Sequence, residues 1–237
     1  MTARERVIVA LDVTALDLAV SLIDRLEGAV LWFKVGAPLF TAAGPGAVEA
    51  VRKRGARVFL DLKYHDIPAA VGSAVREASR LGVGLLTVHA SGGTEMLRAA
   101  AAAAAAETER PLVLAVTVLT SLDRARLQRE LQVPVAVEGQ AVHLATLARA
   151  AGVDGVVASP REAGALRTAL GRELTLVTPG IRPAGATADD QVRVATPAAA
   201  VRAGADYLVV GRPVTGAPDP RVAAAAIIRE IEEAVAR

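Results

Sequence analysis

The sequence predicts an α/β protein whose single domain, residues 1–237, folds as a (β/α)8 TIM barrel. Strand-like apolar runs alternate with helical patterns eight times along the chain, and the length of 237 residues suits one such barrel. Hydrophobic residues make up 53 % of the chain and aromatic residues only 3 %, so the core is expected to consist of Ala, Val, Leu and Ile. This composition is typical of parallel strands covered on both faces by helices.

The expected strands are short aliphatic runs separated by helical patterns. In chain order they are Val7–Leu11, Leu31–Val35, Val58–Leu62, Leu85–His89, Val113–Leu119, Gly155–Ala158, Leu174–Thr178 and Tyr207–Val210. Proline stands where a first helical turn is expected, because its fixed φ suits that position. These prolines are Pro38, Pro68, Pro160, Pro197 and Pro213. Glycine stands where the helices are expected to stop, at Gly28, Gly55, Gly82, Gly152, Gly171 and Gly204.

Residues 99–106 are eight consecutive alanines, which predict one outer helix because alanine is the best helix former. The alternative architecture is a doubly wound open sheet. That fold usually carries Gly-x-Gly-x-x-Gly after its first strand, and no such motif follows Val7–Leu11 here.

Composition excludes several kinds of site. The chain has no cysteine, which rules out disulfides, thiolate metal sites and a cysteine nucleophile. With 27 basic and 25 acidic residues the net charge is +2, and no run of Lys or Arg indicates nucleic-acid binding. The N-terminus is charged, and the apolar stretches are too short for a membrane span. We therefore expect a cytoplasmic protein without nucleic-acid or membrane partners.

Charged residues gather at the ends of the expected strands. Asp61 and Lys63 are two residues apart at the third strand, so alternation should point both side chains the same way. Asp12 and Lys34 lie at or near the ends of the first two strands. A lone Asp-x-Lys could be a rim salt bridge of little consequence. Several charges on one rim are costly to assemble for stability alone, and they predict an active site.

The segment from Phe59 to Pro68 reads Phe-Leu-Asp-Leu-Lys-Tyr-His-Asp-Ile-Pro. It closely resembles the Asp-x-Lys-x-x-Asp signature of the orotidine 5′-phosphate decarboxylase family. Sugar-phosphate decarboxylases and aldolases of the same superfamily carry a similar signature, so the ordered set of further motifs makes the resemblance specific. These motifs are Ala10-Leu11-Asp12, Phe33-Lys34-Val35-Gly36, Leu119-Thr120-Ser121, Thr178-Pro179-Gly180-Ile181-Arg182 and Val210-Gly211-Arg212-Pro213.

The resemblance implies a lyase that decarboxylates orotidine 5′-phosphate to uridine 5′-phosphate in de novo pyrimidine synthesis, without a cofactor or a metal. Lys63 is then the proton donor to the carbon that loses CO₂. Asp61 lies near the substrate carboxylate and helps to keep Lys63 protonated. Lys34 and Asp12 contact the ribose hydroxyls, with Lys34 also bridging the two aspartates.

The same resemblance assigns the other substrate contacts to Thr120, Arg182, Gln191, Gly211 and Arg212. Gly211 and Arg212 open the last βα loop, where barrels commonly bind phosphate. The long stretch from Pro179 through Gln191 is expected to close over that phosphate. Thr120, with Ser121 close behind, is expected to face the pyrimidine amide.

Asp66 follows the third strand, where alternation no longer places its side chain. By resemblance it reaches into the active site of a second subunit, which makes the enzyme a homodimer. Two other functions stay open at this point. A sugar-phosphate decarboxylase or aldolase would need Mg²⁺, and such relatives usually carry an acid where this chain has Lys34. A catalytically silent phosphate-ligand binder would have no need for Lys63 between two aspartates.

Overall fold

The computed structural model describes residues 1–183 and 193–236. Eight parallel strands form a closed barrel in which each strand pairs with its neighbours in sequence and β1 pairs with β8. The strands are β1 (Val7–Ala10), β2 (Trp32–Gly36), β3 (Arg57–Tyr64), β4 (Leu85–His89), β5 (Leu112–Val116), β6 (Gly155–Val157), β7 (Thr175–Thr178) and β8 (Tyr207–Val210). The predicted barrel is thereby confirmed, and the open-sheet alternative is wrong because the sheet has no edge.

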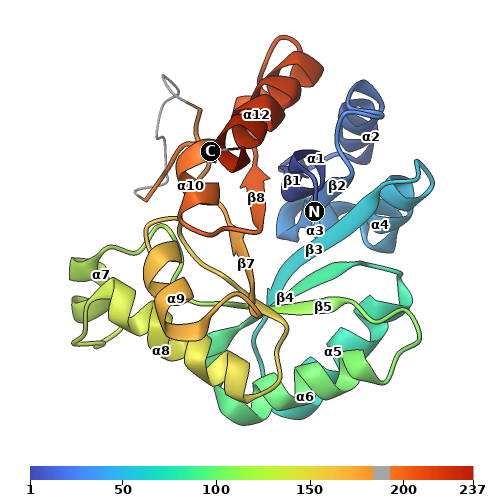
Figure 1. Cartoon of the computed structure of the whole chain (residues 1–237). Helices are drawn as coiled ribbons and strands as arrows, with labels where there is room; N and C mark the ends of the chain where they lie inside the picture. Colours follow the sequence, from blue (N-terminus) through green and yellow to red (C-terminus); the bar gives the residue numbers. More distant parts are fainter. Residues whose placement is uncertain (184–192, 237) are drawn as a thin grey trace.

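Helices lie around the outside of the strands (Figure 1). They are α1 (Ala3–Arg6), α2 (Leu16–Arg25), α3 (Ala37–Ala43), α4 (Pro45–Arg52), α5 (Pro68–Arg80), the 3₁₀ helix η1 (Ala90–Gly92), α6 (Gly93–Ala105), α7 (Arg124–Arg129), α8 (Val137–Ala150), α9 (Ala163–Leu170), α10 (Pro197–Arg202), α11 (Arg212–Thr215) and α12 (Pro220–Val235). The alanine run lies in α6, as predicted, except for Ala106, which caps the end of that helix. Within the described part of the chain, no helix is long and apolar enough to cross a bilayer.

The predicted helix ends are largely as expected. All six glycines proposed as helix stops have positive φ, which an L side chain adopts only at a cost. Pro160 is the exception among the prolines, because α9 begins only at Ala163. The intervening residues form a turn in which the Glu162 amide donates to the Ser159 carbonyl at 3.0 Å. The Glu162 side chain accepts from the Ser159 amide at 3.1 Å and so holds this turn outside the helix.

Two layers of apolar side chains make up the core. The larger layer lies between the barrel and its helices, and a smaller cluster that includes Ile8, Trp32 and Phe59 fills the barrel interior. Because strand side chains alternate, the face that carries Trp32 and Phe59 carries Lys34 and Asp61 two residues later. The interior thus changes from apolar to charged toward the C-terminal ends of the strands.

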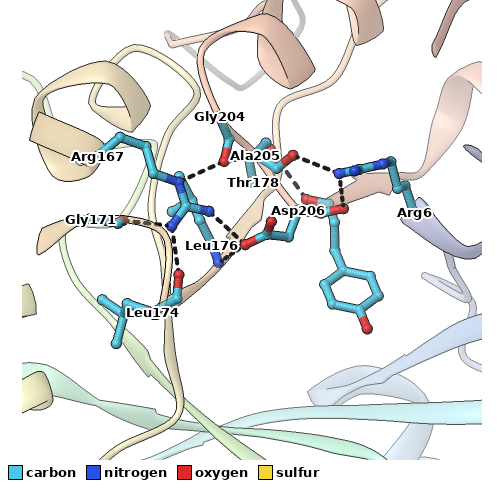
Figure 2. Close-up of polar contacts among 10 residues, drawn as sticks. Arg6, Arg167, Gly171, Leu174, Leu176, Thr178, Gly204, Ala205 and Asp206 are labelled. Carbon is cyan, nitrogen blue, oxygen red and sulfur yellow. Dashed lines mark hydrogen bonds and ion pairs between the residues drawn. The ribbon is translucent and has the colours of Figure 1, made fainter. Parts of the chain in front are cut away.

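At the opposite end, polar side chains tie neighbouring strands together (Figure 2). The Asp206 carboxylate accepts from the Leu176 amide at 2.8 Å and from the Arg167 guanidinium at 2.5 Å. Arg167 also donates to the Gly204 carbonyl at 2.8 Å and to the Leu174 carbonyl at 2.6 Å. These bonds join the starts of β7 and β8, far along the barrel from the charged end.

Candidate active site

The charged end of the barrel opens into a cavity of about 450 Å³. Its walls come from the C-terminal ends of the strands and from the loops that follow them, where barrel enzymes place their active sites. Every described residue that the sequence analysis assigned to substrate or catalysis lines it, except Asp66. They are Asp12, Lys34, Asp61, Lys63, Thr120, Arg182, Gly211 and Arg212. Gln191 lies outside the described residues.

Four of these side chains form a continuous chain of alternating charge. The Lys34 ammonium lies 3.0 Å from Asp12 Oδ1 and 3.5 Å from Asp61 Oδ2. The other oxygen of Asp61, Oδ1, lies 2.8 Å from the Lys63 ammonium. The side chains of Lys34 and Asp61 are each 11 % exposed, whereas that of Lys63 is 37 % exposed. Lys63 is therefore the more accessible of the two cations.

Each buried charge is held in its ionised form by the others. Burial works to lower the pKa of the Lys34 ammonium, but Asp61 and Asp12 raise that pKa above its ordinary value. Burial works to raise the pKa of the Asp61 carboxyl, but Lys34, Lys63 and a hydrogen bond from Thr87 hold it below the ordinary value. The cluster therefore presents fixed charges to whatever enters the cavity.

Space for this cluster depends on a missing side chain at Gly36. A Cβ on this residue would lie 3.0 Å from the Lys34 Nζ and 3.7 Å from Asp12 Oδ1. Glycine therefore leaves the Lys34 ammonium room to reach both aspartates.

Asp61 and Lys63 face the same way, as predicted, but regular strand alternation is not the reason. The β3–β4 register shifts between Leu60, which pairs with Leu86, and Tyr64, which pairs with Val88. The bulge thus contains Asp61 and Lys63, and Lys63 has a φ of 52°, in the left-handed region. The Lys63 amide donates to the Thr87 hydroxyl at 2.9 Å, and that hydroxyl lies 3.0 Å from Asp61 Oδ1.

Sequence reasoning missed Thr87. It is buried on β4 and carries no charge, and nothing in its local sequence separates it from a core threonine. Alternation of side chains along Leu85–His89 places Thr87 on the face that points into the barrel, and this position is the sequence feature that could have indicated its role.

Gly211 and Arg212 stand at the end of β8, which is the neighbour of β1 in the barrel, and Arg212 opens α11. A Cβ on Gly211 would lie 3.5 Å from Asp12 Oδ2, so this residue lies beside the charge cluster. Arg182 is 7 % exposed, and its amide donates to the Ala195 carbonyl at 2.9 Å. The start and end of the long β7–α10 connection are therefore joined beside the cavity.

Thr120 lines the cavity, whereas Ser121 is exposed and does not. The predicted fifth strand, Val113–Leu119, extends too far toward Thr120, because β5 stops at Val116. The carbonyls of Val118 and Leu119 accept from the Arg193 guanidinium at 3.1 and 2.8 Å. The carbonyls of Val118 and Leu119 therefore bond a side chain instead of a neighbouring strand, and Thr120 lies in the loop after β5.

Arg193 is a second residue that sequence reasoning missed. It forms a buried ion pair with Glu162 at 2.6 Å, with the two side chains 7 % and 4 % exposed. Burial raises the pKa of Glu162 above its ordinary value, although Arg193 opposes that rise. The pair joins the β5 and β6 loops to the residues that precede α10, so it supports three loops around the cavity.

Asp66 lies outside its own chain's cavity. The stretch from His65 to Ala70 is exposed throughout, and Ile67 is 68 % exposed. Asp66 Oδ1 accepts from the Ile67 amide at 2.6 Å. Within residues 1–183 and 193–236, no group of three or more His, Asp or Glu side chains is arranged to hold a metal ion.

Residues 5–227 match the family described as orotidine 5′-phosphate decarboxylase / HUMPS family. A curated orotidine 5′-phosphate decarboxylase of Moorella thermoacetica is 56 % identical over 237 residues, covering 98 % of this chain and 94 % of its own. One from Heliobacterium modesticaldum is 50 % identical over 242 residues, covering 100 % of both chains. The crystal structure of orotidine 5′-phosphate decarboxylase from Lactobacillus acidophilus matches with a TM-score of 0.85 at 36 % identity, covering 96 % of this chain and 99 % of that one. This chain therefore belongs to the orotidine 5′-phosphate decarboxylase / HUMPS family.

Proposed function

We propose that this protein is a cytoplasmic orotidine 5′-phosphate decarboxylase, which converts orotidine 5′-phosphate to uridine 5′-phosphate and CO₂ in de novo pyrimidine synthesis without a cofactor. The observation that carries the proposal is the chain of alternating charges from Asp12 to Lys63 inside the barrel cavity. Family membership and the names of the curated relatives support it.

The chemistry asks for a cation beside the reacting carbon. When the bond between C6 of the pyrimidine and its carboxylate breaks, CO₂ leaves and the electron pair stays on C6. A carbanion there has no ordinary electron sink, so a nearby ammonium stabilises it and then donates a proton to C6. Lys63 fits this role because its ammonium is held 2.8 Å from Asp61 and is the more exposed cation of the cluster.

Asp61 has two roles in this proposal. Its negative charge holds the Lys63 ammonium at 2.8 Å, and we assign it a position near the carboxylate of the substrate. The Lys34 ammonium contacts Asp61 Oδ2 and also Asp12. We assign Lys34 and Asp12 to the ribose hydroxyls. Thr120 faces the pyrimidine amide.

Recognition of the phosphate falls to residues in the loops that follow β7 and β8. Arg212, the Gly211 amide, Arg182 and Gln191 are the proposed contacts there. Arginine suits this task because its guanidinium donates parallel hydrogen bonds to phosphate oxygens.

We assign Asp66 to the active site of a second subunit, which makes the functional unit a homodimer. The exposure of residues 65–70, with an isoleucine 68 % exposed beside Asp66, supports a covered face in the assembled enzyme. The position of Asp66 outside its own chain's cavity supports donation across that interface.

The test is to add the purified protein to orotidine 5′-phosphate and to follow loss of the orotate absorbance band, with and without EDTA. We expect turnover that EDTA leaves unchanged, and loss of turnover in Lys63→Ala with an unchanged far-UV circular dichroism spectrum. No loss of absorbance with wild type contradicts the proposal. Inhibition by EDTA would favour a Mg²⁺-dependent sugar-phosphate enzyme, and Lys63→Ala activity within about tenfold of wild type would remove Lys63 from the proton-donor role.

A further inference from the structure

The Thr87 hydroxyl joins the side chain of Asp61 to the backbone of Lys63. Thr87 is 0 % exposed, and its hydroxyl is within 3.0 Å of both groups. A hydroxyl has one donor and can accept as well. The ionised Asp61 carboxylate can only accept and the Lys63 amide can only donate, so the hydroxyl donates to Asp61 and accepts from Lys63.

Both hydrogen bonds lie where the regular backbone pairing between β3 and β4 is interrupted. Between the Leu60–Leu86 and Tyr64–Val88 pairs, the β3–β4 ladder is interrupted by the bulge that contains Lys63. The Lys63 amide therefore donates to a side chain, the Thr87 hydroxyl, instead of to a backbone carbonyl. Lys63 itself has a φ of 52°, in the left-handed region that a non-glycine residue rarely adopts. Asp61 Oδ1 accepts from Thr87 and from the Lys63 ammonium at the same time.

We propose that Thr87 is a positioning residue, which locks the Asp61 carboxylate and the Lys63 backbone so that the Lys63 ammonium is held at the reacting carbon. The inference rests on the proposed decarboxylase function and extends it to a residue that touches no substrate. Threonine suits the task because its β-branched side chain is stiff at χ1, which fixes the direction of the hydroxyl. Valine would fill the same space and make neither bond.

The experiment compares Thr87→Val, Thr87→Ser and wild type in decarboxylation of orotidine 5′-phosphate. Thr87→Val removes the hydrogen bond to the charged Asp61 carboxylate, so we expect its kcat to fall by about 10- to 100-fold. KM should change by less than about threefold, because the phosphate contacts are untouched. Thr87→Ser keeps the hydroxyl and should recover most of the lost rate.

The matched control is Thr117→Val. Thr117 is also a buried threonine near the barrel rim, 5 % exposed, but its hydroxyl donates to the Val157 carbonyl at 3.0 Å and touches no charged group. Its kcat should stay within about threefold of wild type. An equal loss in both valine variants would mean general destabilisation and would overturn the positioning role.

A pH profile adds a readout that packing alone would not move. Asp61 faces Lys34 on β2, Lys63 on its own strand and His89 at the end of β4. Loss of the Thr87 hydrogen bond should raise the pKa of Asp61 toward its ordinary value. The acidic limb of kcat/KM should then move to higher pH in Thr87→Val and return in Thr87→Ser.

Crystal structures of wild type and Thr87→Val make the test independent of the reaction. We expect the valine variant to lose the left-handed φ of Lys63 or the contact between Asp61 Oδ1 and Lys63 Nζ. An unchanged Asp61–Lys63 geometry together with an unchanged kcat overturns the inference. Should wild type fail to decarboxylate orotidine 5′-phosphate, the proposed function fails, and the structures alone decide whether Thr87 positions the pair.

Discussion

At the scale of single residues, Arg212 offers a clean separation of binding from chemistry. It lines the cavity beside Gly211, at the start of the loop that follows β8, and we propose it as a contact to the phosphate. We expect Arg212→Ala to raise KM for orotidine 5′-phosphate by about tenfold or more, because it removes charge-assisted hydrogen bonds. kcat can fall as well, since phosphate binding energy can drive loop closure.

The measurement compares orotidine with orotidine 5′-phosphate on both proteins. Wild type should discriminate strongly in favour of the phosphate, and Arg212→Ala should lose much of that preference. Arg202→Ala, which removes an exposed arginine from α10, is the control and should behave as wild type. If Arg212→Ala keeps the full preference for the phosphorylated substrate, the anchor is another residue.

Prediction from sequence succeeds at this scale where the side chain carries its own chemical signal. Lys34, Asp61 and Lys63 are charges in apolar surroundings, and their strand positions place them in one cavity. Thr87 and Arg193 act through contacts with a neighbouring strand and with neighbouring loops, and such contacts depend on register and loop geometry. The bulge that gives Lys63 its left-handed φ has no local signature either, because no glycine marks it.

At the scale of elements, two aspartates tie strand starts in the same way. Asp206 caps the Leu176 amide and pairs with Arg167, while Asp154 caps the Val113 amide at 2.9 Å and pairs with Arg110. The two arginines differ in burial, with the Arg167 side chain 13 % exposed and that of Arg110 42 % exposed. The same chemistry should therefore contribute different amounts of stability.

We expect Arg167→Met to lower the free energy of unfolding by about 3 kcal/mol, because it removes a buried guanidinium that bonds the Asp206 carboxylate and the carbonyls of Gly204 and Leu174. Arg110→Met should cost about 1 kcal/mol or less, because the guanidinium that it removes is 42 % exposed and solvent weakens its attraction to Asp154. Chemical denaturation of both variants checks the order. Neither change should alter kcat of the folded enzyme, since both pairs lie at the end of the barrel away from the cavity. An equal cost for the two variants would contradict the role given to burial.

Elements were predictable from sequence where backbone chemistry is local. Helix stops at glycine and most helix starts at proline follow from φ preferences of those residues alone. Pro160 and the end of the fifth strand could not be placed, because Glu162 holds the turn after Pro160 and its partner Arg193 bonds the carbonyls that follow β5. The two partners are 31 residues apart, so no local pattern reveals their contact.

At the scale of the whole molecule, the barrel divides its work between two ends. One end ties strand starts with ion pairs, and the other gathers the charges that a reaction would use. The stretch of residues 65–70 departs from this division, because it follows β3, which carries Asp61 and Lys63, and yet is exposed throughout and includes an exposed isoleucine. A second subunit over this face would bury the isoleucine and bring Asp66 to the partner's cavity.

Subunit exchange between two inactive variants tests that arrangement, because a shared active site predicts how much activity returns. Lys63→Ala and Asp66→Asn proteins should each be nearly inactive alone. In a mixed dimer, one site takes Lys63 from one chain and Asp66 from the other, so it is intact, while the second site carries both lesions. Random exchange makes about half of the dimers mixed, so roughly a quarter of wild-type activity should return.

The control mixes Lys63→Ala with Asp61→Asn. Asp61 and Lys63 lie 2.8 Å apart in the cavity of one chain, so every site of the mixed dimer carries one lesion. This mixture should stay inactive although exchange is as complete as in the first experiment, which size-exclusion chromatography of a tagged subunit verifies. Recovery in the control would mean that activity returns by a route other than shared sites. If the first mixture regains no activity although exchange is shown to occur, Asp66 does not serve the partner's active site. Dimerisation would then not be needed for catalysis.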